Sequence, residues 1–190
     1  MRMTQIRWAS RLSIVGLGLF TVLGINTFTF AQKTPVVYVA PIEGIIDLGL
    51  APFVQRVLDE AIDVGAAAVI LEINTFGGRL DAAVLICDAL LNARVRTVAF
   101  VNKRAISAGA LIALAAEKIV MADGGTIGAA TPVQIEQPGS PAQPAEEKTV
   151  SFVRKEFRAT AESRKRSPLI AEAMVDADVE SQDSSKKASS

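Results

Sequence analysis

Continuous apolar runs alternate with amphipathic stretches along most of the chain, and this pattern predicts an α/β fold. The runs at 67–73 and 97–101 have the length of strands, and the first is typical of a strand buried on both faces. Residues 50–64 and 80–91 have the pattern of helices, and 148–166 is typical of a charged amphipathic helix. Repeated strand–helix units with glycine loops after the strands predict a mostly parallel sheet.

Shorter elements complete this prediction. Strands are expected at 36–40, 42–46, 118–121 and 126–128, and helices at 110–116 and 169–175. The first two strands are expected to be broken near Pro41 and Gly44. The prolines between 132 and 147 exclude regular structure in that stretch and predict an exposed, flexible loop.

Both ends of the chain differ in composition from the part between them. Residues 1–31 have a basic start, an apolar segment and small residues at Thr29 and Ala31, which is the pattern of a signal peptide cleaved after Ala31. The alternative is an uncleaved N-terminal membrane anchor, and either case predicts an exported, membrane-associated or periplasmic protein. Residues 32–180 form the predicted domain, and the Ser/Lys-rich residues 181–190 are expected to be a disordered tail.

The composition excludes several kinds of chemistry. The chain has no histidine, which rules out Ser-His-Asp triads, Cys-His pairs and His-ligated zinc, and no metal or organic cofactor is expected. The single cysteine, Cys87, lies on an apolar helical face and is interpreted as a core thiol. A net charge of zero argues against nucleic acid as a partner, and the basic run 164–166 is interpreted as a solvated face.

Ser107 is the residue around which the candidate chemistry is organised. It lies between the strand at 97–101 and the helix at 110–116. The unpaired N–H groups and the positive dipole end of that helix point at whatever the hydroxyl attacks. Nucleophile-bearing turns have this geometry. The alternative is that Ser107 caps the helix with its side chain, which is a common use of serine.

Three stretches in a fixed order resemble a known family. They are Leu-Glu-Ile-Asn-Thr-Phe-Gly-Gly at 71–78, Arg-Ala-Ile-Ser-Ala-Gly-Ala at 104–110 and Ile-Gly-Ala-Ala-Thr-Pro at 127–132. Together they resemble the protease domain of the NfeD-type membrane-associated serine proteases, a ClpP-class group with a Ser–Lys dyad. The resemblance covers residues 35–180 and implies a ClpP/crotonase-like fold of repeated ββα units. Phe76 is a departure, since the family usually has proline there.

The resemblance implies a role for each matching residue. Ser107 matches the nucleophile and Lys148 the general base. A serine hydroxyl needs such a base, and a chain without histidine can use a neutral lysine. Because lysine has an ordinary pKa of about 10.4, a lysine base must be desolvated or lie near a positive potential. The alternative for Lys148 is a solvated charge on a charged helix.

The same resemblance implies an oxyanion hole. Gly78 and Ala108 match the positions whose N–H groups would stabilise the developing negative charge, and losing one such donor costs about 10²–10³ in rate. Gly77 is expected to keep the loop at 74–78 tight. Gly77 and Gly109 are both assigned as residues that support the substrate-binding loop. The alternative for the glycine pair is an ordinary turn between a strand and a helix.

The expected function is that of a serine endopeptidase that cleaves hydrophobic segments of membrane-associated proteins. The resemblance implies stomatin-like membrane proteins as candidate partners and a homo-oligomeric assembly. It stops after Glu180, which predicts a truncated domain. Two alternatives stay open: a non-catalytic scaffold that binds a membrane partner, and a crotonase-like acyl-CoA enzyme with a carboxylate base. Among proteases, signal peptide peptidase is the nearest rival, because it uses the same dyad chemistry.

Overall fold

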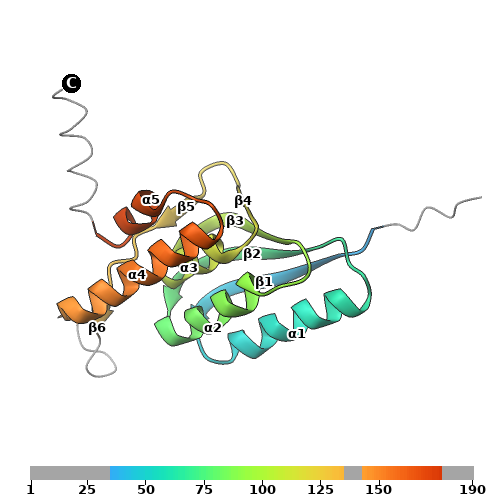
Figure 1. Ribbon diagram of the computed structural model, residues 1–190, viewed down its shortest axis with the longest axis horizontal. Coiled ribbons are helices and arrows are strands. Elements are labelled where there is room, and N and C mark those ends of the chain that lie inside the picture. The colour runs from blue at the N-terminus through green and yellow to red at the C-terminus, as the bar shows by residue number, and fades with distance from the viewer. Residues whose placement is uncertain (1–34, 135–142, 177–190) are drawn as a thin grey trace, which may run out of the picture. The chain divides into compact units, whose positions relative to one another are not determined.

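The computed structural model describes residues 35–134 and 143–176, which form an α/β domain (Figure 1). The strands are β1 (Val37–Ile46), β2 (Ala68–Gly78), β3 (Thr97–Ile106), β4 (Lys118–Met121), β5 (Thr126–Gly128), β6 (Val133–Gln134) and β7 (Gln143–Pro144). The helices are α1 (Leu50–Asp63), α2 (Leu80–Leu91), α3 (Ala108–Ala115), α4 (Glu147–Ser163) and α5 (Pro168–Ala173). The five-stranded sheet has the order β1-β2-β3-β4, with β5 also on β3, and all its ladders are parallel. The predicted mostly parallel α/β fold is confirmed.

One face of the sheet carries the described helices. Helices α1 and α3 pack against the strands of the sheet. Helix α2 contacts both α1 and α3, and Figure 1 shows α1 and α2 side by side. In β2 the side chains of Val69, Leu71 and Ile73 are fully buried under these helices. Ile70 and Glu72, which alternate with them, are only half-buried. The prediction that 67–73 is buried on both faces is therefore wrong, because these helices cover a single face.

Residues 37–46 form one strand where two were predicted. The Ala67 N–H donates to the Val36 carbonyl at 2.8 Å, so the even-numbered residues of β1 turn their backbone groups toward β2. Pro41 is an odd-numbered residue, and its missing N–H would have pointed to the open edge of the sheet. No ladder hydrogen bond is lost there, so the proline does not break the strand.

Helix α3 is buried along its whole length. All eight of its residues are buried, since it lies on β2 and β3 and contacts α2 and α4. Gly109 is the point of closest approach, where an added Cβ would lie 2.5 Å from Thr75 Cγ2. Cys87 is 4% exposed and its Sγ contacts the Leu111 carbonyl at 3.5 Å. This burial confirms that Cys87 is a core residue, and it raises the pKa of the thiol, which disfavours the nucleophilic thiolate.

The basic run 164–166 is not a solvated face. Arg164 and Arg166 are half-buried, and their guanidinium groups donate to backbone carbonyls of the helix layer. Only Lys165 is exposed. The sequence-based interpretation was wrong for the two arginines, because the carbonyl groups they bind lie far away along the chain.

The prediction that 132–147 lacks regular structure is wrong near its ends, where β6 and β7 pair and α4 begins at Glu147. Strand β6 pairs antiparallel with β7, while 135–142 lie outside the described residues. The predicted signal or anchor at 1–31 and the predicted tail at 181–190 also lie outside them. Among residues 35–134 and 143–176, no helix is both long enough and apolar enough to cross a membrane.

Candidate active site

Ser107 connects β3 to α3 in a backbone conformation that L-amino acids rarely adopt. Its φ and ψ are 55° and −120°, and its N–H donates to the Gly128 carbonyl at 2.9 Å. Its side chain makes no capping hydrogen bond to α3, so the alternative role as a side-chain cap is wrong. Strained backbone of this kind is typical of functional sites, where the surrounding structure holds it in place. The half-buried hydroxyl is directed to the end of β2 instead.

Gly77 packs directly against Ser107. It has a φ of 107°, and a Cβ added to it would lie 2.7 Å from Ser107 Cβ and 3.2 Å from Ser107 Oγ. Real Cβ atoms do not approach other carbon atoms this closely. Glycine is therefore required here both by the contact with Ser107 and by the positive φ. The structure thus brings the end of β2 into contact with the candidate nucleophile.

Gly78 and Ala108, the two candidate oxyanion donors, directly follow Gly77 and Ser107 in the chain. The Arg79 N–H donates to the Ile46 carbonyl at 2.8 Å, toward β1. A Cβ added to Gly78 would collide with the backbone of Ile46, so this position requires glycine and packs against the last residue of β1. Ala108 is the first residue of α3, where an N–H has no acceptor within the helix.

Thr75 is a site residue that the sequence reasoning missed. Its side chain is 2% exposed, and its Oγ1 donates to the Gly44 carbonyl at 2.5 Å. The same Oγ1 accepts the Gly77 N–H at 2.9 Å, which ties the glycine loop to β1. A threonine two residues before a glycine pair is a recognisable signal for such a side-chain turn.

Phe76 occupies the position where the sequence departs from the family resemblance. It is 73% exposed, and the Arg104 guanidinium carbon lies 4.6 Å from the centre of its ring. A cation–π contact of this kind joins the end of β2 to β3. Phe76 leaves the glycine conformation intact, because its ring turns to the side of Arg104.

Lys148 is the second residue of α4 and is exposed. Among the described residues, no hydrogen bond joins its amino group to Ser107. The start of α4 is attached to the segment after β5 by a hydrogen bond from the Ala145 N–H to the Pro132 carbonyl, at 3.2 Å. The structure therefore brings together Ser107 and the glycine loop, but leaves Lys148 without a bond to the candidate nucleophile.

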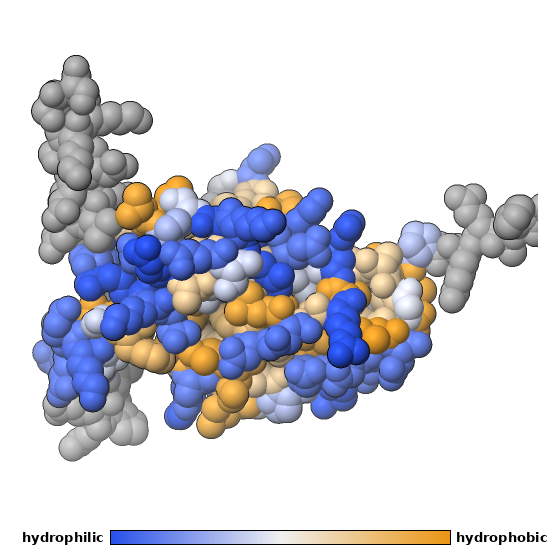
Figure 2. Space-filling model, viewed as in Figure 1, coloured by the Kyte–Doolittle hydropathy of each residue, from blue (hydrophilic) through white to orange (hydrophobic). Residues whose placement is uncertain are grey.

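An apolar depression lies beside the glycine loop. It has a volume of about 710 Å³ and is lined by Leu48, Arg79, Leu80, Asp81, Val84, Leu85 and Phe152. Arg79 follows Gly78 directly in the chain, and Phe152 lies on α4 one helical turn after Lys148, so the depression is lined from the start of α2 and from α4. The face seen in Figure 2 is mostly hydrophilic, with apolar side chains exposed between the charged ones.

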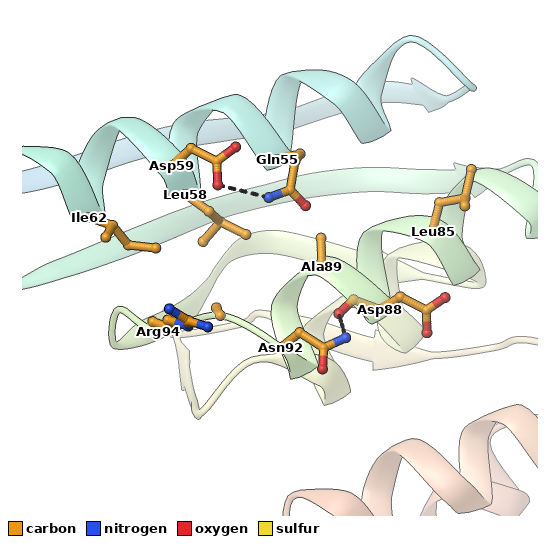
Figure 3. Close-up of a pocket in the computed structure, with 10 residues that line it drawn as sticks. Gln55, Leu58, Asp59, Ile62, Leu85, Asp88, Ala89, Asn92 and Arg94 are labelled. Atoms are coloured by element: carbon orange, nitrogen blue, oxygen red, sulfur yellow. Dashed lines mark hydrogen bonds between the residues drawn. The ribbon is translucent and has the colours of Figure 1, made fainter.

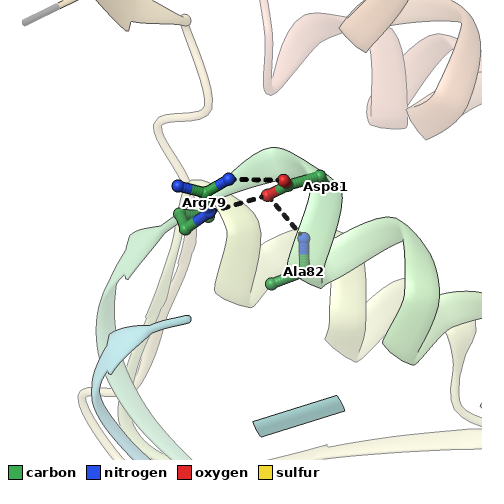
Figure 4. Close-up of polar contacts among 3 residues, drawn as sticks. All are labelled: Arg79, Asp81 and Ala82. Carbon is green, nitrogen blue, oxygen red and sulfur yellow. Dashed lines mark hydrogen bonds and ion pairs between the residues drawn. The ribbon is translucent and has the colours of Figure 1, made fainter. Parts of the chain in front are cut away.

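A bidentate ion pair forms part of the lining of this depression. Arg79 donates to Asp81 Oδ1 from Nε at 3.0 Å and to Oδ2 from Nη2 at 2.6 Å, and Asp81 also accepts the Ala82 N–H (Figure 4). The hydrogen bond from Arg79 lowers the pKa of Asp81, so the carboxylate is charged at neutral pH. The carboxylate lies in the first turn of α2, where the helix dipole favours a negative charge.

A second depression, of about 440 Å³, lies between α1 and the later turns of α2 (Figure 3). Gln55 and Asp59 are hydrogen-bonded at 3.0 Å on its α1 side, and Asp88 and Asn92 lie on its α2 side. None of the residues assigned to the candidate active site lines it.

A sequence profile of the NfeD1b N-terminal domain family matches residues 36–190 of the chain. The chain belongs to this family. Membrane protein NfeD1b of Bacillus subtilis is 38% identical over 181 residues, which make up 95% of this chain and 40% of that protein. This NfeD1b-type chain therefore spans less than half the length of that relative. The family resemblance found in the sequence is confirmed, but the match continues to residue 190 and does not stop after Glu180.

Solved structures similar to this NfeD1b-type domain include proteases. The membrane-bound stomatin-specific protease 1510-N, in complex with a substrate peptide, is 29% identical with a TM-score of 0.71, and the match covers 77% of this chain and 68% of that one. ClpP1 from Listeria monocytogenes is 20% identical with a TM-score of 0.51, over 73% of this chain and 78% of that one, and shares the fold alone. The NfeD1b-type domain has a ClpP-like fold, as the sequence predicted.

Proposed function

We propose that this chain is a serine endopeptidase of the ClpP/NfeD class. The observation that carries the proposal is the strained conformation of Ser107 at the start of α3, with its side chain against Gly77 and unused as a helix cap. Such a conformation costs about 1–3 kcal/mol, and strain of this kind clusters at active sites. Similarity to the protease 1510-N supports the same reaction class.

The proposed reaction is acyl transfer through Ser107. Its Oγ attacks the carbonyl carbon of a peptide bond while its proton passes to the neutral amino group of Lys148. The Gly78 and Ala108 N–H groups stabilise the oxyanion of the tetrahedral intermediate. When the C–N bond breaks, the leaving amine takes the proton from Lys148, and water then hydrolyses the acyl-enzyme with Lys148 again as the base.

The substrate class we propose is a polypeptide with a hydrophobic segment. The apolar depression lined from the start of α2 and from α4 supports it, because Leu80, Val84 and Phe152 offer an apolar side chain a place to bind. The 1510-N protease is named for its specificity for stomatin, which makes a stomatin-like membrane protein the candidate partner. An exported, membrane-associated homo-oligomer is part of the same proposal.

Covalent labelling tests the proposed nucleophile directly. We expect a fluorophosphonate to modify the full chain once, with the added mass located by peptide mass spectrometry on the peptide that contains Ser107. Unactivated serines elsewhere, such as the exposed Ser163, should remain unmodified under the same conditions. Equal modification of several serines, or none, would count against an activated nucleophile.

A non-catalytic scaffold is the second candidate function. The observation that favours it is the exposed Lys148, which makes no hydrogen bond to Ser107 among the described residues. A scaffold would bind a hydrophobic peptide with equal affinity before and after Ser107→Ala, and would neither cleave it nor react with the fluorophosphonate. Selective labelling of Ser107 would eliminate this candidate.

Phe152→Ala tests the apolar depression. We expect it to raise KM about fivefold to tenfold for peptides with a large apolar residue at the cleavage site, with kcat changed less, because the lost contact area is worth about 1 kcal/mol or more. Phe53→Ala is the control, since Phe53 is a half-buried phenylalanine on α1 that does not line the depression. If both variants change KM equally, the depression is not the binding site.

A further inference from the structure

Arg164 and Arg166, together called the arginine clamp, join the C-terminal ends of three helices. Arg164 follows α4, and its Nε and Nη2 donate to the Ala115 and Leu90 carbonyls, both at 2.7 Å. Arg166 donates from Nη1 to the Leu114 carbonyl at 2.7 Å. Its Nη2 donates to the Ala116 carbonyl at 2.9 Å and to the Glu117 carbonyl at 3.1 Å. The acceptors belong to the last turns of α2 and α3 and the residues just after α3.

The chemistry of the clamp suits this place. The last carbonyl groups of a helix have no partner within the helix and carry the negative end of its dipole. A guanidinium group can donate to two such carbonyls at once, because its N–H groups form a planar fork. A lysine would offer only a compact, strongly hydrated charge. The clamp is therefore specific for arginine at both positions.

The backbone between the two arginines directs them both inward. Lys165 has a φ of 57°, its N–H donates to the Glu162 carbonyl at 3.0 Å, and the Arg166 N–H donates to the Ala161 carbonyl at 2.8 Å. This pair of bonds is the Schellman motif that ends many helices. It reverses the chain at Lys165, so that Arg164 and Arg166 reach the layer of helices while Lys165 stays exposed.

The clamp lies at one end of α3 and α4, and the proposed catalytic pair lies at the other. Ser107 precedes α3 and Lys148 is in the first turn of α4. Both helix starts are attached to the same segment, since Ser107 N–H donates to the Gly128 carbonyl and Ala145 N–H to the Pro132 carbonyl. Figure 1 shows α4 lying across α3, and the two helices are in contact.

We propose that the arginine clamp positions Lys148 for its reaction with Ser107. Helix α4 has 17 residues and behaves as a rod about 25 Å long, so a displacement at its clamped end moves its first turn as well. Buried residues of α4, among them Val153 and Phe157, pack along the helix. The clamp fixes the position of α4 along its own axis relative to α3, because it binds the last turn of α3. Arg164 and Arg166 are positioning residues, since they bind neither substrate nor Ser107.

The test measures the rate of Ser107 labelling by a fluorophosphonate in the full chain. We expect the double variant Arg164→Ala/Arg166→Ala to be labelled at least about tenfold more slowly, because a shift of 1 Å in a catalytic group can cost about 10² in rate. In a Lys148→Ala background the same two substitutions should cause no further loss, because they act through Lys148. If the alanine pair does not fold, the variant Arg164→Lys/Arg166→Lys is measured in its place. It keeps the two charges but loses the planar fork, so slower labelling is expected there too.

Val54→Ala is the control for stability, because Val54 is fully buried in α1 and belongs to neither the clamp nor the site. It should lower the unfolding temperature and leave the labelling rate unchanged. An equal loss of labelling with and without Lys148 would show a purely structural clamp and overturn the inference, as would labelling of the clamp variants at the rate of the unmodified chain. The inference rests on the proposed peptidase function, and failure of that function looks different: the unmodified chain itself would not be labelled at Ser107.

Discussion

Ser107→Ala is expected to lower kcat/KM for an apolar peptide by about 10³-fold or more. The substitution removes the only group that we propose to form a covalent bond to the substrate, and the backbone N–H groups that remain supply only part of the catalysis. Lys148→Ala should cause a loss of similar size, since an unactivated hydroxyl is a weak nucleophile. The double variant should be no worse than either single one, because the two groups act as one unit. Cleavage of a fluorogenic peptide by the full chain measures all four proteins.

Two matched substitutions on α4 control this series. Lys155→Ala removes an exposed lysine from the same helix as Lys148, and Ser163→Ala removes an exposed serine whose Oγ donates to the Ala159 carbonyl. Both should cleave the peptide at the rate of the unmodified chain. If Lys155→Ala lost as much activity as Lys148→Ala, the assignment of the base would be wrong. If Ser107→Ala kept its activity, the peptidase itself would be a contaminant.

The sequence predicted best those elements whose ends are determined by residues within and beside the element itself. The bounds expected for α2, β4 and β5 agree with the structure, because apolar spacing and flanking turn residues determine such segments locally. Pro41 was misread because its effect depends on β1 lying at the sheet edge with its odd-numbered residues turned outward. Ile70 was misread because an apolar run does not show how many faces of a sheet are covered.

The same distinction applies to the candidate site. Parallel strands bring their carboxyl ends to one edge, so the glycine pair at the end of β2 and Ser107 after β3 could be expected to meet. The contact partners of Arg164 and Arg166 could not be expected, since the carbonyl groups at Leu90 and Leu114 become acceptors only when three helices end together. The role of Thr75 in binding Gly77 and Gly44 was not predicted, because the interpretation of this motif considered only its two glycines. The position of Lys148 depends on the segment 132–147 and on packing along α4, neither of which the local pattern encodes.

Gly77→Ala is expected to lower kcat/KM by about 10²-fold or more while the chain still folds. The added methyl group would lie 2.7 Å from Ser107 Cβ, and the φ of 107° is unfavourable for any residue with a side chain. Either the glycine loop or Ser107 must move, and a displacement of 1 Å in the reacting geometry can cost about 10² in rate. The loop also holds Gly78, so the oxyanion donor moves together with Gly77. Peptide cleavage and fluorophosphonate labelling should both slow down.

Gly124→Ala separates the two causes of this loss. Gly124 also has a positive φ, of 75°, but a Cβ added there meets nothing within 4 Å. That variant should lose about 1–2 kcal/mol of unfolding free energy from backbone strain and keep its activity. Gly77→Ala should suffer greater strain, because its φ of 107° lies further from the left-handed region, and it should lose activity in addition, because its methyl group collides with Ser107. If the two glycine variants retained equal activity, the contact between Gly77 and Ser107 would have no part in catalysis, and the proposed site would lose its geometric foundation.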